Sequence, residues 1–283
     1  MKNFLKSSGK AVLYALFYVT IQTLVGIVYM VVSTVSYIWT HLSLLQGDPA
    51  AALPLLMDSM LENMDRHTIM LVLLSNLVAL VIIWLFFVLR KKKLSHEIGL
   101  GKISLRNFIA AALFGASFSV VLSLVISLIP FPEEMVESLN ANSEALTNDI
   151  SLLSFITVAL IGPITEEVFF RGLVYTRLKA GMNAIAAAMI SSILFGLGHG
   201  GFIWFLSAFL AGLAMVWIFE TTKSLYAAIT IHVANNAISL LTQDTIAPIW
   251  LIGLCIVVLI GTAFYIVRTN PPIALRSVKS SEA

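Results

Sequence analysis

The stretch that decides the fold is ISLLSFITVALIGPITEEVFFRG, residues 150–172. Its first sixteen residues carry no charge, which approaches the roughly 20 apolar residues that a helix needs to cross a bilayer. Two glutamates and an arginine follow directly, at positions 166, 167 and 171. Two questions arise: whether the whole chain is built from such segments, and why ionisable side chains stand in this one.

Composition answers the first question. Of the 283 residues, 59% are hydrophobic and only 11% are charged, and the mean hydropathy is +0.96. Soluble domains are usually about a quarter charged. The chain is therefore predicted to be an integral membrane protein, with the lipid bilayer as its surroundings and no nucleic-acid partner.

Long uncharged segments predict eight transmembrane helices in an all-α bundle. The forty-residue segment 180–219 is twice the length that one span needs, and Gly198-His199-Gly200-Gly201 interrupts it, so we interpret it as two spans. The expected spans lie near residues 11–40, 68–89, 107–129, 150–176, 182–199, 202–219, 225–242 and 247–267.

The distribution of basic residues predicts the orientation. If the eight helices alternate and the amino terminus is inside, sixteen of the seventeen Lys and Arg residues fall on the inner side, and only Arg66 falls outside. This asymmetry follows the positive-inside rule. Both termini are accordingly expected in the cytosol of what its small size and short loops suggest is a bacterial plasma membrane.

The chain is expected to form one transmembrane domain over residues 1–283. The outer interval 41–67 is predicted to hold a short surface helix beginning near Pro54, and residues 130–149 an acidic solvated loop. Small residues recur in the fifth and sixth spans and predict that these two helices are central. Residues 269–283 are expected to be a flexible cytosolic tail.

Ionisable side chains within spans are costly and by default indicate a functional site. Three places qualify: the fourth span with Glu166, Glu167 and Arg171, the fifth with His199, and the seventh with His232, Asn235 and Asn236. Residues four apart share a helix face, so Glu167 is expected to pair with Arg171 and to leave Glu166 free. The alternative is that this stretch is a solvated helix end past the membrane edge.

A carboxylate, two imidazoles and an amide in a hydrated hollow suit hydrolysis. Glu166 can take a proton from water, His199 can help to hold that water, and His232 with Asn236 can stabilise the developing oxyanion. The alternative is a zinc site with Glu166, His199 and His232 as its three ligands and a bound water in the fourth position. The sequence does not choose between them.

Other intramembrane hydrolases fit less well. The serines near these residues, Ser191 and Ser192, lack the Gly-x-Ser-x element of rhomboid-type serine proteases. Two membrane-embedded aspartates, as an aspartyl protease requires, are not found in the spans, and the His-Glu-x-x-His of site-two zinc proteases is absent.

Three motifs in order resemble those of a known family: Glu166-Glu167-Val168-Phe169-Phe170-Arg171, then Phe195-Gly196-Leu197-Gly198-His199, then His232-Val233-Ala234-Asn235-Asn236. They resemble the CPBP family of CAAX proteases and bacteriocin-processing enzymes, also called Abi proteins, over roughly residues 150–243. The resemblance implies an eight-helix intramembrane endopeptidase with a site of Glu166, His199, His232 and Asn236.

The resemblance further implies that Glu167, Arg171 and Phe195 support the site. Family members are often labelled metalloproteases, although a metal-free glutamate and histidine mechanism is also proposed for them, and we favour the metal-free form. The expected substrate is a membrane-embedded or membrane-tethered peptide or protein. The alternative is a non-catalytic bacteriocin-immunity or scaffold protein in which the polar layer only holds helices together; a transporter is less compatible, since no inverted repeat is visible.

Overall fold

All regular secondary structure among the described residues is helical. The computed structural model describes residues 2–40, 49–147, 151–242 and 247–270, and no strand occurs among them. The elements are α1 (Lys2–Thr40), α3 (Pro49–Leu89), α4 (Leu94–Glu97), α5 (Leu105–Ser127), α6 (Glu133–Thr147), α7 (Leu152–Ser154), η1 (Phe155–Ile161), α8 (Gly162–Glu167), η2 (Val168–Tyr175), α9 (Thr176–Lys179), α10 (Ala184–Leu197), α11 (Phe202–Thr222), α12 (Leu225–Thr242) and α13 (Ile249–Thr269).

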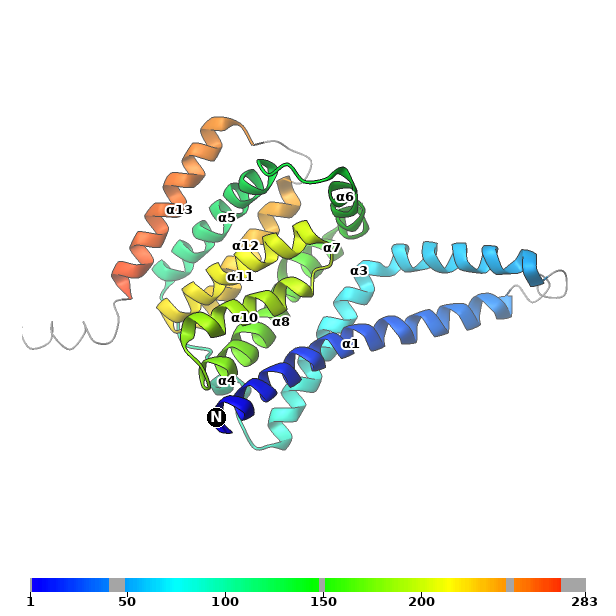
Figure 1. Ribbon diagram of the computed structural model, residues 1–283, viewed down its shortest axis with the longest axis horizontal. Coiled ribbons are helices and arrows are strands. Elements are labelled where there is room, and N and C mark those ends of the chain that lie inside the picture. Colours follow the sequence, from blue (N-terminus) through cyan, green and yellow to red (C-terminus); the bar gives the residue numbers. More distant parts are fainter. Residues whose placement is uncertain (1, 41–48, 148–150, 243–246, 271–283) are drawn as a thin grey trace, which may run out of the picture.

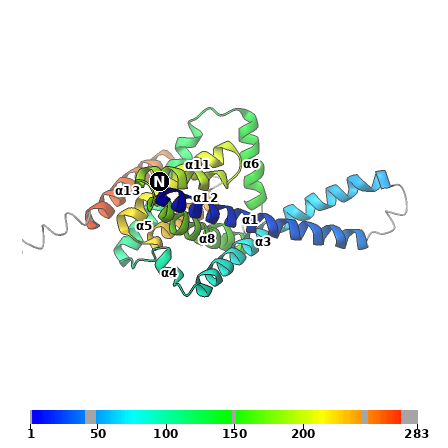
Figure 2. The same ribbon diagram turned by 60° about the horizontal axis from the view of Figure 1, so that its bottom comes forward.

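The helices form one bundle with a projecting hairpin (Figure 1). α5 packs on α12 and on α13, and α10 packs on α11. α1 and α3 pack together along one side of this bundle, and their distal halves extend beyond it in both views (Figures 1 and 2). α1 contacts η2, and α3 contacts α8, so the hairpin lies against the segment that carries the glutamates.

Seven helices of the described chain are long and apolar enough to cross a membrane, which makes the protein a multi-pass membrane protein. They correspond to all the expected spans except 182–199, which is the shorter helix α10 of 14 residues. At 1.5 Å per residue, α10 is about 21 Å long. The number of eight spans and the cytosolic position of both termini stay predictions.

The fourth span alternates between α-helix and π-helix. Two π-helical segments, η1 and η2, lie on either side of the six-residue α-helix α8. Pro163 lies near the start of α8 and has no amide hydrogen, and the amide of Gly162 bonds five residues back to the carbonyl of Thr157. π-helical turns are rare and are found frequently at functional sites.

Small residues allow the central helices to approach closely, as the sequence predicted for the fifth and sixth spans. A Cβ on Gly212 of α11 would lie 3.0 Å from the Cβ of Ser192 on α10. A Cβ on Gly115 of α5 would lie only 2.3 Å from the carbonyl oxygen of Ile231 on α12. The turn between α10 and α11 uses Gly200 and Gly201, both with positive φ.

Two local predictions were wrong. The short surface helix expected from Pro54 is the first part of the continuous helix α3, which accommodates Pro54 in its interior. The expected acidic loop contains the helix α6, whose first turn carries Glu133 and Glu134 beside the positive end of the helix dipole. The tail predicted from residue 269 lies, from residue 271 on, outside the described residues.

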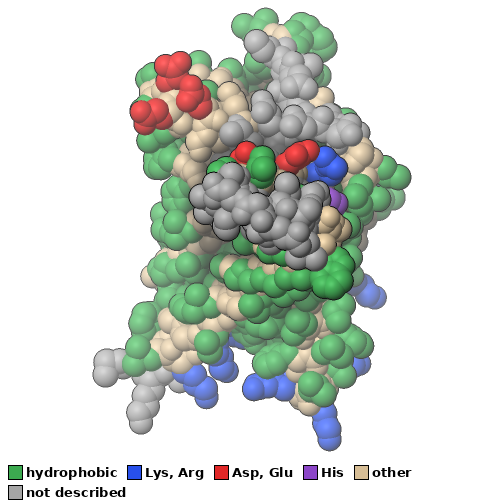
Figure 3. All heavy atoms as spheres, turned by 90° about the vertical axis from the view of Figure 1, so that its right-hand side faces the viewer, with side chains coloured by type: hydrophobic (Ala, Val, Ile, Leu, Met, Phe, Trp, Pro, Cys, Tyr) green, Lys and Arg blue, Asp and Glu red, His purple; other side chains and the backbone are tan. Residues whose placement is uncertain are grey.

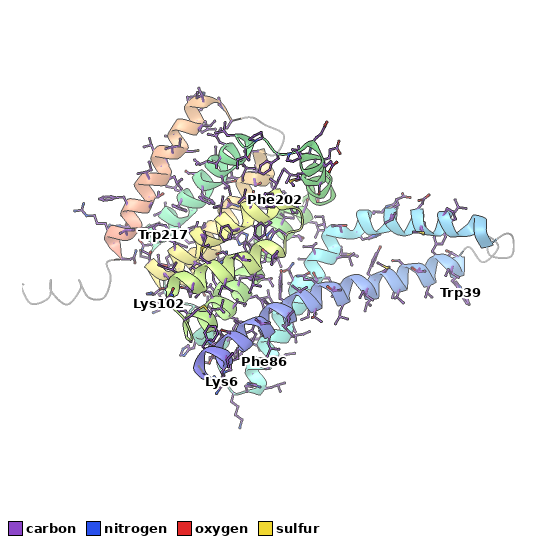
Figure 4. All side chains as sticks on the ribbon, in the orientation of Figure 1. Lys6, Trp39, Phe86, Lys102, Phe202 and Trp217 are labelled. Carbon is purple, nitrogen blue, oxygen red and sulfur yellow. The ribbon has the colours of Figure 1, made fainter. Side chains whose placement is uncertain are left out.

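Charged side chains separate to opposite ends of the molecule. On the face in Figure 3, most Lys and Arg side chains gather at one end, and acidic side chains lie toward the other. Figure 4 places Lys6 and Lys102 at the first end and Phe202 at the other. We call the end that carries Lys6 and Lys102 the basic end; the positive-inside rule predicts that it faces the cytosol.

Candidate active site

The site is built around a buried ion pair. Nη1 of Arg171 lies 2.8 Å from Oε1 of Glu167, and the side chains are 1% and 0% exposed. These are the residues that the spacing of four predicted to pair. The guanidinium meets no hydrogen-bond acceptor among the described residues beyond this ion pair. Glu167 is therefore the group that compensates a fully desolvated positive charge.

His232 joins the two glutamates. Its Nδ1 lies 2.9 Å from Oε1 of Glu167, within hydrogen-bond distance, and its Nε2 lies 3.5 Å from Oε2 of Glu166. His232 is buried, whereas the Glu166 side chain is 21% exposed. A carboxylate on one ring nitrogen orients the imidazole and determines what the other nitrogen can do. Glu167 thus directs Nε2 of His232 toward Glu166.

Phe195 packs the cationic and imidazole groups together. The guanidinium carbon of Arg171 lies 4.2 Å from the centroid of its ring, a cation–π contact. The rings of His199 and His232 meet it edge to face at centroid distances of 4.6 and 5.7 Å. The centroids of the two imidazoles therefore lie no farther apart than the sum of those distances, and both rings contact the buried Phe195 ring.

The side chains of His199 and Asn236 each interact with a backbone carbonyl oxygen. His199 is half-buried at the carboxyl end of α10, and its Nδ1 lies 2.9 Å from the carbonyl oxygen of Phe195. Nδ2 of Asn236 donates to the carbonyl oxygen of Val158 in η1, at 3.0 Å. Within the described chain, His199 forms no ion pair with either glutamate. The imidazole that contacts Glu166 is thus that of His232.

The zinc alternative requires Glu166, His199 and His232 to converge on one ion. Among the described residues, no group of three or more His, Cys, Asp or Glu side chains is placed to hold a metal ion. Glu166 and His232 are neighbours, whereas His199 contacts the ring and the carbonyl oxygen of Phe195. The three predicted ligands do not form a ligand set in this structure.

A second polar cluster, not anticipated from the sequence, lies between α1 and α3. Tyr18 donates to Oδ1 of Asn76 at 3.0 Å, Gln22 approaches the same oxygen at 3.4 Å, and Ser75 donates to Gln22. The Tyr18 ring packs on the rings of Phe169 and Phe170, with centroid distances of 4.9 and 5.8 Å. The signal was present as uncharged polar residues within two apolar spans, but site candidates were sought only in spans that carry ionisable residues.

We call the group of Glu166, Glu167, Arg171 and His232 the polar centre. The fold and the polar centre together define a multi-pass helical membrane protein with a buried carboxylate and imidazole group. Residues 148–238 match the family model described as Type II CAAX prenyl endopeptidase Rce1-like, and all three motifs lie inside that match. The recognition made from the motifs is thereby confirmed: this segment, which carries the polar centre, is of the Rce1-like CAAX protease family.

Two curated bacterial relatives have peptidase or protease names, and a third has a name that states no activity. The chain is 28% identical over 104 residues to "Putative membrane peptidase YdiL" of Bacillus subtilis, covering 36% of this chain and 43% of that protein. It is 28% identical over 145 residues to "Membrane-embedded CAAX protease MroQ" of Staphylococcus aureus, covering 47% and 57%. It is 23% identical over 151 residues to "UPF0177 protein YxdF" of Lactococcus lactis, covering 50% and 84%.

The matches with the first two relatives span about half the length of those proteins. No solved structure matches the chain. The family match, over residues 148–238, covers the part of the bundle that contains Glu166, Glu167, His199 and His232.

Proposed function

We propose that this protein is an intramembrane endopeptidase that hydrolyses peptide bonds of membrane-embedded or membrane-tethered substrates, with Glu166 as the general base. The observation that carries the proposal is the contact of Glu166 with Nε2 of His232, whose other nitrogen is held by Glu167. Of the two adjacent glutamates, Glu167 is committed to Arg171, so Glu166 is the one available to water. The Rce1-like match supports a protease.

In the proposed reaction, the Glu166 carboxylate takes a proton from a water molecule, and the water oxygen adds to the scissile carbonyl carbon. His232 holds the water with Glu166, and Asn236 and His199 donate to the oxyanion once substrate has displaced their present backbone contacts. The oxyanion then collapses, the C–N bond breaks, and the proton held on Glu166 passes to the leaving amine. No step in this scheme requires a metal ion.

The scheme shifts one role from the arrangement expected from sequence. From the sequence, His199 was expected to hold the water and His232 to stabilise the oxyanion. The contact of His232 with Glu166 supports the reverse assignment. A hydrated hollow at Glu166 is part of the proposal, and the partial exposure of its side chain supports it.

The test is cleavage of a membrane-tethered, fluorescence-quenched peptide library by purified protein in vesicles. Glu166→Gln is expected to lower the cleavage rate by a factor of about 10²–10⁴, the range for loss of a general base. Undiminished cleavage by Glu166→Gln would remove the assignment. Elemental analysis of the same active preparation tests the metal-free scheme, and a stoichiometric metal lost together with activity on chelation would contradict it.

The non-catalytic alternative makes the opposite prediction. If the protein acts as an immunity or scaffold factor, its function in cells survives Glu166→Gln, because that residue contributes little to packing. The buried pair of Glu167 and Arg171 would be retained in either case, so it does not separate the two functions.

A further inference from the structure

A lipid-facing groove lies between α1 and α3 at the basic end, away from the polar centre. It is a cavity of about 650 Å³, within the range of ligand pockets, and its lining is mostly apolar, including Leu13 and Phe17 of α1 and Ile83 and Phe86 of α3. Figure 4 shows Phe86 at this end, near Lys6. Leu13 is 65% exposed, so much of this apolar surface is open to the surroundings.

Cations crowd one end of the groove. Its lining includes Lys10, Arg90, Lys92 and Arg177 but only one carboxylate, Glu97. Lys92 and Arg177 both pair with Glu97. Lys10 and Arg90 form no ion pair among the described residues, and the Arg90 guanidinium lies over the Phe86 ring at 4.6 Å. The groove therefore ends in an excess of positive charge.

We propose that this groove binds one anionic phospholipid, with an acyl chain along Leu13, Phe17 and Ile83 and the phosphate between Lys10 and Arg90. A water-soluble anion would leave the apolar lining uncovered, and an apolar peptide would leave the cations without a counter-charge. An anionic lipid satisfies both. The position agrees as well, because basic side chains next to spans attract the anionic headgroups of the cytoplasmic leaflet.

The proposal concerns a site that does not depend on peptide hydrolysis, so the test measures lipid binding directly. Native mass spectrometry of the detergent-solubilised protein, titrated with phosphatidylglycerol or phosphatidylcholine, gives the affinity for each lipid. The protein is expected to bind phosphatidylglycerol more tightly than phosphatidylcholine. The double variant Lys10→Gln, Arg90→Gln is expected to lose that affinity by about thirtyfold, since each removed charge contributes about fivefold.

The matched control removes two other charges from the basic end. Lys102→Gln with Arg106→Gln changes the net charge equally, but neither residue lines the groove and both are exposed. It is expected to retain the affinity for phosphatidylglycerol. An equal loss in both double variants would reduce the effect to general surface attraction and would overturn the proposal, as would unchanged binding in the first.

A third variant tests whether the acyl chain enters the groove. Leu16 lines it and is 56% exposed, so Leu16→Trp fills the groove without crowding the protein interior. It is expected to weaken phosphatidylglycerol binding at least tenfold while unfolding like the original protein. Unchanged binding by Leu16→Trp, or displacement of the lipid by glycerol phosphate, would show that only the headgroup is recognised and would contradict the proposal.

Discussion

Exchanging either of two adjacent glutamates for glutamine is predicted to change the free energy of unfolding by very different amounts. Glu167 is completely buried and contacts both Arg171 at 2.8 Å and His232 at 2.9 Å. Glu166, one position earlier, is 21% exposed and contacts His232 at 3.5 Å. The substitution is the same and the sequence position almost the same, so each variant is the control of the other.

The magnitude follows from the burial of Arg171. Removing one partner of a buried ion pair costs about 3–5 kcal/mol, because the remaining charge is desolvated and uncompensated. The cation–π contact with Phe195 offsets only about 2 kcal/mol of such a loss. Glu167→Gln is therefore expected to lower the free energy of unfolding by about 1–3 kcal/mol. Glu166→Gln is expected to change it by less than about 1 kcal/mol.

The assay is equilibrium unfolding in mixed detergent and dodecyl sulfate micelles, followed by circular dichroism, beside peptide cleavage in vesicles. The double variant Glu167→Gln, Arg171→Met removes both charges and should recover most of the lost stability, since replacing a whole buried pair by apolar groups is often neutral. It should not recover cleavage, because His232 still lacks its carboxylate partner. Equal unfolding free energies for the two single variants would refute the reasoning.

Three further predictions rest on other contacts. Gly115→Ala should lower the free energy of unfolding by about 1–3 kcal/mol, because the new Cβ would meet the α12 backbone at 2.3 Å, whereas Gly253→Ala, with open space around it, should not lower it; urea or dodecyl sulfate titration compares the two. Hydrogen bonds from Lys92 and from Arg177 hold the pKa of the Glu97 carboxyl below its ordinary value. The contribution of the Glu97 carboxylate to the free energy of unfolding is therefore fully present above about pH 4.3, the ordinary pKa, and is lost as the pH falls through the lower pKa of the folded protein. The difference in unfolding free energy between the protein and Glu97→Gln should shrink as the pH falls through this range. Phe195→Leu should lower the cleavage rate by a larger factor than it lowers the equilibrium constant for folding, measured in the same two assays, because the Phe195 ring orients two imidazoles while Leu still fills part of the space.

The membrane-spanning architecture could be predicted from the sequence because the length of a hydrophobic segment is a strong local signal. It also predicted the pair of Glu167 and Arg171, since helical spacing alone brings residues four apart together. Close packing of the fifth and sixth spans followed from their small residues, of which Gly212 and Ser192 lie in direct contact range.

Features that depend on tertiary packing were not predictable in the same way. Pro54 was expected to begin a helix, but α3 already begins at Pro49 and continues through Pro54. The orientation of His232 depends on how α12 packs against α8, which brings its Nδ1 to Glu167, sixty-five residues earlier in the sequence, and no local pattern encodes it. The polar cluster of Tyr18 and Asn76 likewise joins helices that are distant in sequence.

The brevity of α10 has a consequence for solvation. A helix of about 21 Å is roughly 9 Å shorter than a hydrocarbon core of about 30 Å, so the glycine turn that follows it would end below one lipid surface if α10 starts at the other. Irregular backbone at such a depth is tolerated only where protein covers it or water reaches it. Gly198 and Gly200 are both exposed, so the bilayer must thin or admit water beside His199.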